Sequence, residues 1–363
     1  MSQASSIASG RVVTLTPNPT LDAISEVGRG VFLETLGGRD VLRVPPFRYQ
    51  VGGKGITCAR VLKALGGKHL AVVLLGRDGV SRCVEYYLRN QNLKIRIVRT
   101  SSLGRIALIV TETEESAAGV SGEAATGVDY RINGKGSPAG PEVLQNLMDV
   151  LRRSLHGASA LALAGSLPEG APADYYGQCI SLGRSLVPLV MLDSSGTPLL
   201  HGAMARPHLI KINSREAADL MDEAEPGTIS EAAALAWRIA ARFNAGDRVG
   251  GVEKVIITMG SLGAAAVDGK TGAQWAVRSP KVRARGALGA GDSFSAGLAY
   301  ALTSGRDFPE ALRWGAACGA ATAEKRPGEV GDRGRILELF DQVEIVPLEI
   351  QAEVAAASAK PSG

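Results

Sequence analysis

The chain has 363 residues, 45% of them hydrophobic and 4% aromatic, with 40 Lys and Arg against 36 Asp and Glu. This composition is typical of a globular protein and excludes a disordered, collagen-like or coiled-coil chain. The net charge of +4 is small and dispersed along the chain, so it indicates no nucleic-acid surface. Glycine is the outlier, because 45 residues exceed the usual share of about 7%; such glycine serves turns, tight packing or close approach of the backbone to a ligand.

Six short apolar runs lead into helical patterns, which predicts buried parallel strands joined by crossover helices. The runs cover residues 12–15, 70–75, 160–164, 186–192, 208–212 and 255–258. The helical patterns cover residues 55–65, 80–90, 142–155, 173–184, 214–221, 230–243, 293–302 and 310–324, and a last strand is predicted at 343–346. Together they predict an α/β fold with a doubly wound, mostly parallel sheet flanked by helices.

Two segments, residues 31–50 and 103–132, alternate apolar and polar residues between glycine breaks. This period of two predicts exposed strands with one buried face, and we interpret them as a small β-sheet lid. The lid is either a cover over a sugar site, a dimer contact or an edge sheet that only packs. Residues 114–127 are expected to be a loop. Residues 1–10 and 348–363 are expected to be disordered, which leaves one domain over residues 11–347.

Cysteine usage and the chain ends indicate a reducing compartment. The four cysteines, Cys58, Cys83, Cys179 and Cys318, form no CxxC pair, so neither a disulfide framework nor a zinc site is predicted. Residues 1–10 lack the features of a signal peptide, and no apolar run approaches the ~20 residues that span a bilayer. We expect a cytoplasmic protein with no membrane partner.

The strongest chemical signal is the sequence GALGAGDSFSAGLAYAL at residues 286–302. Here Gly289, Ala290 and Gly291 allow successive backbone N–H groups to converge at a helix N-terminus, where the helix dipole also favours an anion. Asp292 follows directly and has the acceptor capacity of a general base for a hydroxyl group. The competing interpretation is that Asp292 is simply the N-cap of the helix.

A second glycine cluster, VGGKGITCARVLKALGG at residues 51–67, precedes a predicted helix. The bare backbone at Gly52 and Gly53 can approach a polyhydroxy ligand and donate hydrogen bonds to it, although, taken singly, the cluster is better explained by a tight turn before a helix. The chain has no Walker A loop, and TPNPTLDAI rather than GxGxxG follows the first strand, which argues against a dinucleotide site. In that segment two prolines predict a turn from which Asp22 reaches sugar hydroxyls.

Three further pieces lie at strand ends, where an open α/β sheet binds its ligands. The first, AGSLP, offers Ser166. The second, KINSREAADL, places Asn213 and Glu216 on one helix face, where they either hold water around a nucleotide-bound Mg²⁺ or form a capping box. The third, TMGSLGAAAV at residues 258–267, is a glycine-punctuated turn that runs beside a nucleotide or is an ordinary hairpin.

In this order the pieces resemble the ribokinase-like PfkB carbohydrate kinases, and most of all their phosphofructokinase and tagatose-6-phosphate kinase branch. The resemblance runs from about residue 11 to 346 and rests on TPNPTLD, GGKGI, AGSLPEG, DSSG, KINSRE, TMGSLGA and GAGDSFSAG. It implies transfer of the γ-phosphoryl group of ATP, with Mg²⁺, to a hydroxyl of a sugar phosphate. The expected reaction converts fructose 6-phosphate into fructose 1,6-bisphosphate.

The resemblance also implies the roles of individual residues. Asp292 is the catalytic base, and the amides of Gly289, Ala290 and Gly291 stabilise the transferring group. The sugar-side residues are Asp22, Gly52, Gly53, Lys54, Thr57, Ser166, Arg105 and Arg43, the two arginines holding the phosphate that the substrate already carries. The nucleotide-side residues are Lys211, Asn213, Glu216, Thr258, Gly260 and Gly263, with Glu216 holding Mg²⁺ through water.

Several alternatives stay open. Thr57 stands where relatives have asparagine, and Val41 replaces a lid lysine, so the choice of sugar is less defined than the phosphoryl transfer. A 1-phosphofructokinase, a tagatose-6-phosphate kinase, another sugar or nucleoside kinase, or a non-catalytic sensor of sugar phosphate or ATP are the competing functions. The resemblance adds K⁺ as a candidate second cation and a homodimer formed through the lid.

Overall fold

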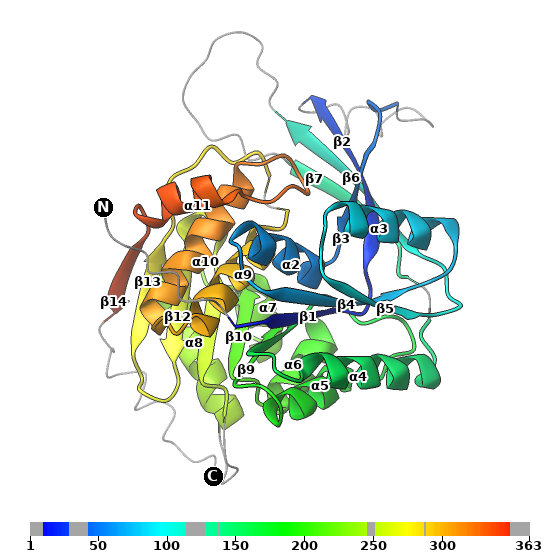
Figure 1. Ribbon diagram of the computed structural model, residues 1–363. Coiled ribbons are helices and arrows are strands. Elements are labelled where there is room, and N and C mark those ends of the chain that lie inside the picture. The colour runs from blue at the N-terminus through cyan, green and yellow to red at the C-terminus, as the bar shows by residue number, and fades with distance from the viewer. Residues whose placement is uncertain are drawn as a thin grey trace.

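The computed structural model describes residues 10–28, 43–113, 128–136, 138–244, 251–286 and 288–348. Ten strands form one sheet in the order β14-β13-β12-β11-β10-β9-β8-β1-β4-β5 (Figure 1). Their bounds are β1 Val12–Thr16, β4 His69–Leu75, β5 Ile95–Arg99, β8 Ala160–Ala164, β9 Leu189–Asp193, β10 Leu209–Asn213, β11 Lys254–Thr258, β12 Ala264–Asp268, β13 Gln274–Arg278 and β14 Glu344–Leu348. The pairs from β5 to β11 are parallel, whereas β11 to β14 pair antiparallel.

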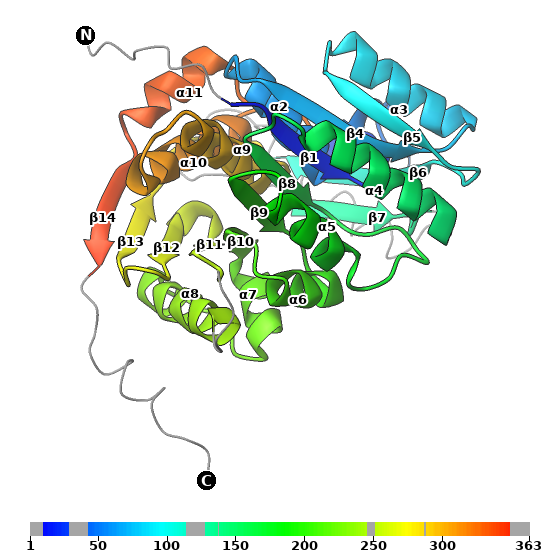
Figure 2. The ribbon, with the colours of Figure 1, turned by 60° about the horizontal axis from the view of Figure 1, so that its bottom comes forward.

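Helices cover both faces of this sheet, as Figure 2 shows. On one face lie α4 Pro141–Leu155, α5 Tyr175–Arg184, α6 Gly196–Met204, α7 Ser214–Met221 and α8 Ile229–Asn244; on the other lie α2 Lys54–Ala64, α9 Ala290–Thr303, α10 Phe308–Ala323 and α11 Arg333–Phe340. Alternate strand residues serve the two cores: Leu161 and Leu163 pack with the first layer, and Ala160 and Ala162 with the second. The strands are therefore apolar on both faces.

A separate sheet of four strands, in the order β3-β2-β6-β7, stands beside the large one (Figure 1). Its strands are β2 Thr20–Gly28, β3 Arg48–Gly52, β6 Arg105–Thr113 and β7 Val128–Asn133, and α3 Gly79–Asn90 packs against β2 and β3. We call this sheet the lid. A small second sheet is confirmed, but the strand bounds differ from those predicted. Residues 31–42 of the first predicted lid segment lie outside the described residues, and β2 begins at Thr20, in the segment where the prolines predicted a turn.

The remaining sequence predictions divide into those met and those missed. All six buried strands and the eight helices are present within a few residues, and the predicted last strand is β14. The patterns missed β5, β12, β13, α6 and α11. The predicted loop at 114–127, Val41 and most of the two predicted disordered ends lie outside the described residues. Among the helices described, none combines the length and apolarity needed to cross a bilayer.

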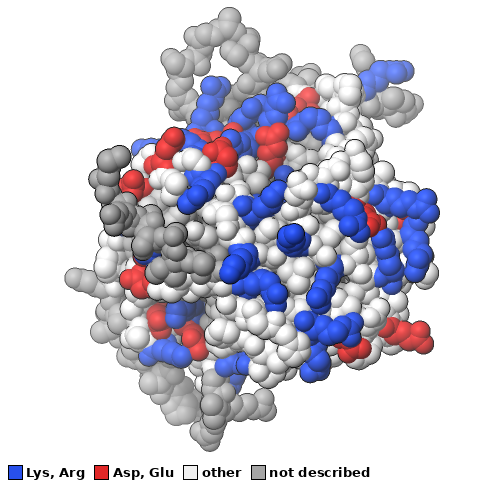
Figure 3. Space-filling view, in the orientation of Figure 1, with Lys and Arg blue, Asp and Glu red and all other residues white. Residues whose placement is uncertain are grey.

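Basic and acidic side chains are unevenly distributed over the surface, although the net charge is small. Lys and Arg side chains gather on the face that carries α2, α3, β4 and β5, with few carboxylates among them (Figure 3). Exposed members include Lys63 at the end of α2 and Lys94 and Arg96 around the start of β5. These positions lie at the amino ends of parallel strands, and the polar cluster described next lies at their carboxyl ends.

Candidate active site

Four charged residues meet at the carboxyl edge of the large sheet. Asp193 is the last residue of β9, Lys211 lies in β10, Lys54 opens α2 and Asp292 lies in the first turn of α9. The Asp193 carboxylate accepts from Lys54 Nζ at 2.6 Å and from Lys211 Nζ at 2.8 Å, and Ser295 Oγ donates to it at 3.0 Å. The same edge forms a small pocket whose polar lining is Lys54, Asp193, Lys211, Asp292 and Ser295.

The charges in this cluster determine which groups ionise. Burial opposes ionisation of Asp193, but Lys211 and Lys54 outweigh it and hold the pKa of Asp193 below its usual range. Burial likewise disfavours the charged form of Lys54, whereas Asp193 and Glu216 favour it, and the pKa of Lys54 is raised. Asp193 is therefore held ionised between Lys54 and Lys211, and Lys54 is held protonated.

Asp292 behaves differently from Asp193. Burial, and then the neighbouring charge of Asp193, raise the pKa of Asp292 to about 6, against the lowering effect of Lys54 and Lys211. Its carboxylate is ionised at neutral pH and yet basic enough to accept a proton, which is the property required of a general base. The two aspartates therefore have separate chemical roles.

The glycine turn before α9 has the geometry of an anion site. Gly289 is the N-cap residue with φ +83°, and no side chain caps the helix. The interpretation of Asp292 as the N-cap is therefore wrong, since it lies in the first helical turn. A Cβ added at Gly291 would lie 2.9 Å from Lys211 Nζ, so glycine lets this ammonium group lie against the turn. Backbone N–H groups, the helix dipole and Lys211 all favour negative charge here.

On the predicted nucleotide side, Asn213 and Glu216 form the capping box that the spacing allowed. Asn213 Oδ1 accepts from the Glu216 amide at 2.8 Å, and Glu216 Oε2 accepts from the Asn213 amide at 2.9 Å. The other oxygen of Glu216 lies 3.4 Å from Lys54 Nζ, so the cap also points this carboxylate at the charged cluster. Capping and a site role are compatible in this geometry.

The donor set fits Mg²⁺ bound together with a nucleotide. No group of three or more His, Cys, Asp or Glu side chains with metal-binding geometry occurs among the described residues. Mg²⁺ usually keeps several waters and takes only one or two carboxylates plus substrate phosphates. Asp193 and Glu216, which share Lys54 as a neighbour, supply that number of carboxylates.

The turn after β11 continues this side of the site. Thr258 Oγ1 donates to the Ile212 carbonyl at 3.3 Å and ties β11 to β10. Gly260 and Gly263 adopt φ +58° and +103° around a short 3-10 turn, Gly260–Leu262. A Cβ at Gly263 would lie 2.0 Å from the Val277 carbonyl oxygen, so a hairpin role alone explains that glycine. Contact with a nucleotide stays a prediction for these three residues.

On the predicted sugar side, Asp22 lies in β2 directly beside the glycine cluster. The sequence predicted that Asp22 extends from a turn, and this is wrong, because Asp22 lies within the strand. In the pairing of β2 with β3, Asp22 is opposite Gln50. A Cβ at Gly52 would lie 2.2 Å from Asp22 Oδ2, and Gly53 has φ +126°. Burial raises the pKa of Asp22 despite its bond from Thr20. The glycines are therefore required by both the carboxylate and the turn.

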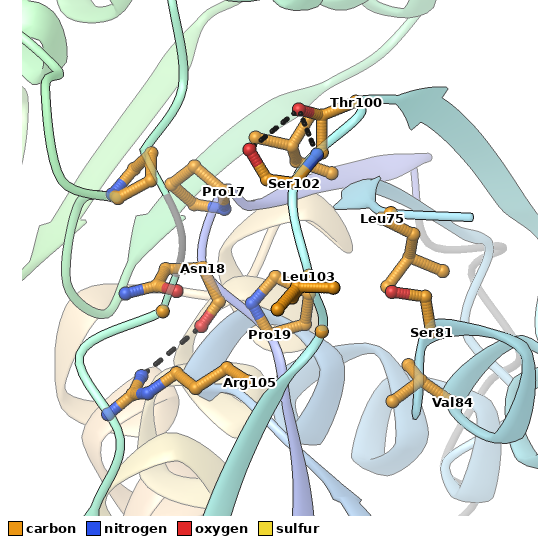
Figure 4. A pocket seen from close by; sticks show the side chains of 15 residues that line it. Pro17, Asn18, Pro19, Leu75, Ser81, Val84, Thr100, Ser102, Leu103 and Arg105 are labelled. Atoms are coloured by element: carbon orange, nitrogen blue, oxygen red, sulfur yellow. Dashed lines mark hydrogen bonds between the residues drawn. The ribbon is translucent and has the colours of Figure 1, made fainter. Parts of the chain in front are cut away.

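Arg105 opens β6 and lines a pocket with Asn18, Ser81, Thr100 and Ser102. Its Nε donates to the Gly134 carbonyl at 2.6 Å. Its Nη1 donates to the Asn18 carbonyl at 3.4 Å, as Figure 4 shows. Burial lowers the pKa of the guanidinium, which the charge of Asp22 opposes. Its donors face carbonyl oxygens rather than a carboxylate, which leaves its positive charge available to an anion.

The last three predicted sugar-side residues are placed unequally. Ser166 is exposed, and its Oγ lies 3.2 Å from Asn18 Nδ2. Thr57 is buried in α2, and a Cβ added at Gly289 would lie 3.3 Å from its methyl group, so it contacts the phosphate-side turn as well. Arg43 is exposed at the start of a described segment and lines neither pocket.

Asp193, Ser295 and Asn18 are the functional candidates that the sequence patterns missed. Asp193 ends a buried apolar run, and a carboxylate directly after such a strand is a signal for a site residue in an open α/β sheet. Asn18 lies between the two prolines that precede β2 and donates to Ser166 and to the Leu167 carbonyl. For Ser295 the sequence offers no signal beyond its place one turn after Gly291.

The site thus combines a carboxylate of raised pKa with a glycine turn suited to an anion. The family model described as pfkB family carbohydrate kinase matches residues 31–329. The chain belongs to this family of carbohydrate kinases, as the motifs predicted.

The relatives and solved structures agree with this assignment. The chain is 28% identical over 341 residues to ATP-dependent 6-phosphofructokinase isozyme 2 of Mycobacterium tuberculosis, covering 94% of this chain and 91% of the relative. It is also 28% identical to 1-phosphofructokinase of Haemophilus influenzae, covering 93% and 99%. Phosphofructokinase-2 from Escherichia coli in complex with potassium has a TM-score of 0.76 at 23% identity, covering 92% and 99%. Ribokinase from Thermotoga maritima has a TM-score of 0.68 at 19% identity, covering 92% and 99%, which confirms the expected ribokinase-like fold.

Proposed function

We propose that this kinase transfers the γ-phosphoryl group of ATP to the free primary hydroxyl of fructose 6-phosphate, forming fructose 1,6-bisphosphate. The observation that carries the proposal is the place of Asp292 in the first turn of α9, directly after the glycine turn at Gly289, where no side chain caps the helix. The pKa of this carboxyl is raised, as a general base requires. Arg105 supports a phosphorylated acceptor, because its guanidinium is half-buried and donates to the carbonyl oxygens of Gly134 and Asn18, which a phosphate can replace.

The residues divide the reaction between them. Asp292 accepts the proton of the attacking hydroxyl as its oxygen bonds to the γ-phosphorus and the bond to ADP breaks. The amides of Gly289, Ala290 and Gly291, together with Lys211, stabilise the charge on the transferring group. Glu216 and Asp193 are the carboxylates that would hold Mg²⁺, in part through water, and the ion would supply further neutralisation of the phosphate charge.

The acceptor is held from the lid and from α2. Asp22 and the amides at Gly52 and Gly53 bind sugar hydroxyls, and Lys54 and Thr57 extend this surface toward the transferring group. Ser166, Arg105 and Arg43 bind the phosphate already present on the sugar. Arg105 would exchange the carbonyls of Gly134 and Asn18 for phosphate oxygens, which form stronger, charge-assisted hydrogen bonds.

The donor is held across β10 and β11. Lys211 and Asn213 face the phosphates, and Thr258, Gly260 and Gly263 run beside the nucleoside. K⁺ is proposed as a second cation, since the Escherichia coli neighbour was solved with potassium; comparing rates in KCl with rates in tetramethylammonium chloride tests it.

Substrate choice is the finer part of the proposal. Relatives named 6-phosphofructokinase and 1-phosphofructokinase are equally identical to the chain, and both acceptors yield fructose 1,6-bisphosphate. The test measures kcat/KM by ADP release with fructose 6-phosphate, fructose 1-phosphate, tagatose 6-phosphate, fructose and a nucleoside. The proposal requires the highest value for fructose 6-phosphate. A higher value for fructose 1-phosphate would replace it, and no turnover with any acceptor would leave a sensor of ATP or sugar phosphate.

We propose that the lid also carries a homodimer contact. Tyr49, Leu108 and Ile132 form a row across three lid strands, on the sheet face opposite Asp22, and are 49%, 38% and 66% exposed. Exposed apolar side chains in one row are typical of an interface. Sedimentation of the wild type and of Ile132→Glu tests this, and a monomeric wild type would exclude it. A cytoplasmic location is proposed from the same family assignment and is tested by cell fractionation.

A further inference from the structure

Arg60 joins the lid to the chain segment between α10 and α11. It lies in the second turn of α2, and its Nη1 donates to the Gly328 carbonyl at 2.7 Å and lies 3.5 Å from Gln50 Oε1 in β3. Among the described residues, no carboxylate lies within ion-pair distance of it. Burial lowers the pKa of Arg60, and only the more distant charges of Glu329 and Asp22 oppose this. Partial burial of a guanidinium without a paired carboxylate costs stability, and the hydrogen bonds from Arg60 to Gly328 and Gln50 offset part of that cost.

The lid end of this contact lies next to the sugar side of the site. Gln50 is opposite Asp22 in the β2–β3 ladder. Gly328 has φ +85°, and a Cβ there would lie 2.9 Å from both the Gln50 side chain and Ile24 Cδ1. The segment between α10 and α11 therefore packs directly against the lid base, toward which it bends in Figure 1.

The other end of the contact reaches the turn at Gly289. The Gly331 amide donates to Thr322 Oγ1 at 3.0 Å, Thr322 Oγ1 donates to Ser293 Oγ at 2.8 Å, and Ser293 Oγ donates to the Gly289 carbonyl at 2.8 Å. Thr322 and Ser293 are 2% and 0% exposed, so water does not replace these bonds easily. Gly289 is the N-cap residue of α9. One short segment, residues 328–331, thus contacts the lid at one end and is connected at the other, through the hydroxyls of Thr322 and Ser293, to the phosphate-side turn.

We propose that Arg60 is a positioning residue that couples the lid to the phosphoryl-transfer turn through Gly328 and the Thr322–Ser293 hydroxyl pair. The proposal rests on the proposed function. Fixing the segment at both ends holds Asp22, and with it the sugar, at a set distance from the turn at Gly289, which favours attack by the sugar hydroxyl. Without this coupling, water competes better: its oxygen bonds to the γ-phosphorus, the bond to ADP breaks, a proton passes to Asp292, and phosphate is released.

The test compares transfer with hydrolysis in Arg60→Met and Thr322→Val. Each variant is assayed for ADP release and for sugar bisphosphate formed, with ATP and the acceptor that the wild type prefers. We expect the ratio of free phosphate to sugar bisphosphate to rise at least tenfold in both variants, and Arg60→Lys to recover part of the loss. Arg184→Met is the matched control, because Arg184 at the end of α5 also donates to a carbonyl, that of Arg206. Both residues precede the amino ends of β9 and β10, at the edge of the sheet opposite the site, so the ratio for this variant should equal that of the wild type.

A merely structural role would lower transfer and hydrolysis together and leave their ratio unchanged, and that result in Arg60→Met would overturn the proposal. If Arg60→Met does not fold, Thr322→Val alone decides, since it keeps the branched side-chain shape and replaces only the hydroxyl by a methyl group. Additive effects on the ratio in the double variant would also contradict coupling, because residues acting through one connection give non-additive effects. Failure of the proposed function is recognised separately, by a wild type that phosphorylates no acceptor.

Discussion

Replacing Asp193 by asparagine is expected to destabilise the protein. The substitution keeps the side-chain size but removes the negative charge of the carboxylate, which accepts hydrogen bonds from Lys54 Nζ at 2.6 Å and from Lys211 Nζ at 2.8 Å. Lys211 is 4% exposed, and removing one partner of a buried ion pair costs about 3–5 kcal/mol. Lys54 is about one-third exposed at its side chain, so solvent screens its part of the loss. We therefore expect the free energy of unfolding in urea to fall by about 3 kcal/mol, chiefly through Lys211.

The same substitution is expected to move the pH profile of catalysis. Asp193 is the second cause, after burial, that raises the pKa of Asp292 to about 6, whereas Lys54 and Lys211 lower it. Without Asp193 the two lysines remain, so the pKa of Asp292 falls. Because the base works only when ionised, the acidic limb of kcat/KM begins near pH 6 in the wild type and at lower pH in the variant.

The assay is ADP release between pH 5 and pH 9 at saturating Mg²⁺, and only the position of the limb is used, since the absolute rate also falls. Ser295→Ala is the matched control, because it removes a hydrogen bond to the same carboxylate without removing its charge; its limb should stay in place. A variant with the wild-type limb and undiminished stability would refute the argument that Asp193 sets the charge balance of the site.

Three further substitutions test other parts of the site. Arg105→Ala should reduce kcat/KM for sugar phosphates about 10- to 100-fold, because hydrogen bonds to charged groups contribute about 1.5–3 kcal/mol; an equal loss with unphosphorylated fructose would contradict a phosphate contact. Gly291→Ala should retain the melting temperature yet lower kcat, since the new Cβ would lie 2.9 Å from Lys211 Nζ, and an unchanged kcat would exclude that crowding. Asn213→Ala should lower the free energy of unfolding by about 0.5–2 kcal/mol, because an N-cap is lost, and should also raise KM for ATP. The control is Asp307→Ala, which removes the N-cap of α10; the same KM in both variants would leave Asn213 with a capping role alone.

The sequence predicts the central strands because parallel strands are buried on both faces, which produces continuous apolar runs. It fails where that signal is weak. The strand β2 follows two prolines, so its start reads as a turn, and β12 is mostly alanine with a length of only five residues. The helix α6 begins Gly-Thr-Pro, which local rules assign to a turn as readily as to a first helical turn.

The candidate site divides in the same way. Asp292 and its glycines are contiguous in sequence, so local chemistry suffices to suggest a base beside an anion site. The contact between Lys54 and Asp193 joins residues 139 positions apart, and no local pattern indicates which lysine neutralises which carboxylate. The hydroxyl pair of Thr322 and Ser293 was missed for the same reason, since its members are 29 positions apart.

The central claim is that Asp292 is the base of a sugar-phosphate kinase, and the most direct measurement is bisphosphate formation by Asp292→Asn with ATP and fructose 6-phosphate. Because folding raises the pKa of this carboxyl to about 6, its ionised form destabilises the folded protein, most fully above pH 6. Asp292→Asn removes that cost, so the variant should be at least as stable as the wild type at pH 8. The difference in stability between the two should be smaller at pH 5. We predict a folded variant whose kcat is lower by about 10²- to 10⁴-fold, the usual effect of removing a general base. A folded Asp292→Asn protein that retains more than a third of the wild-type rate would contradict the account.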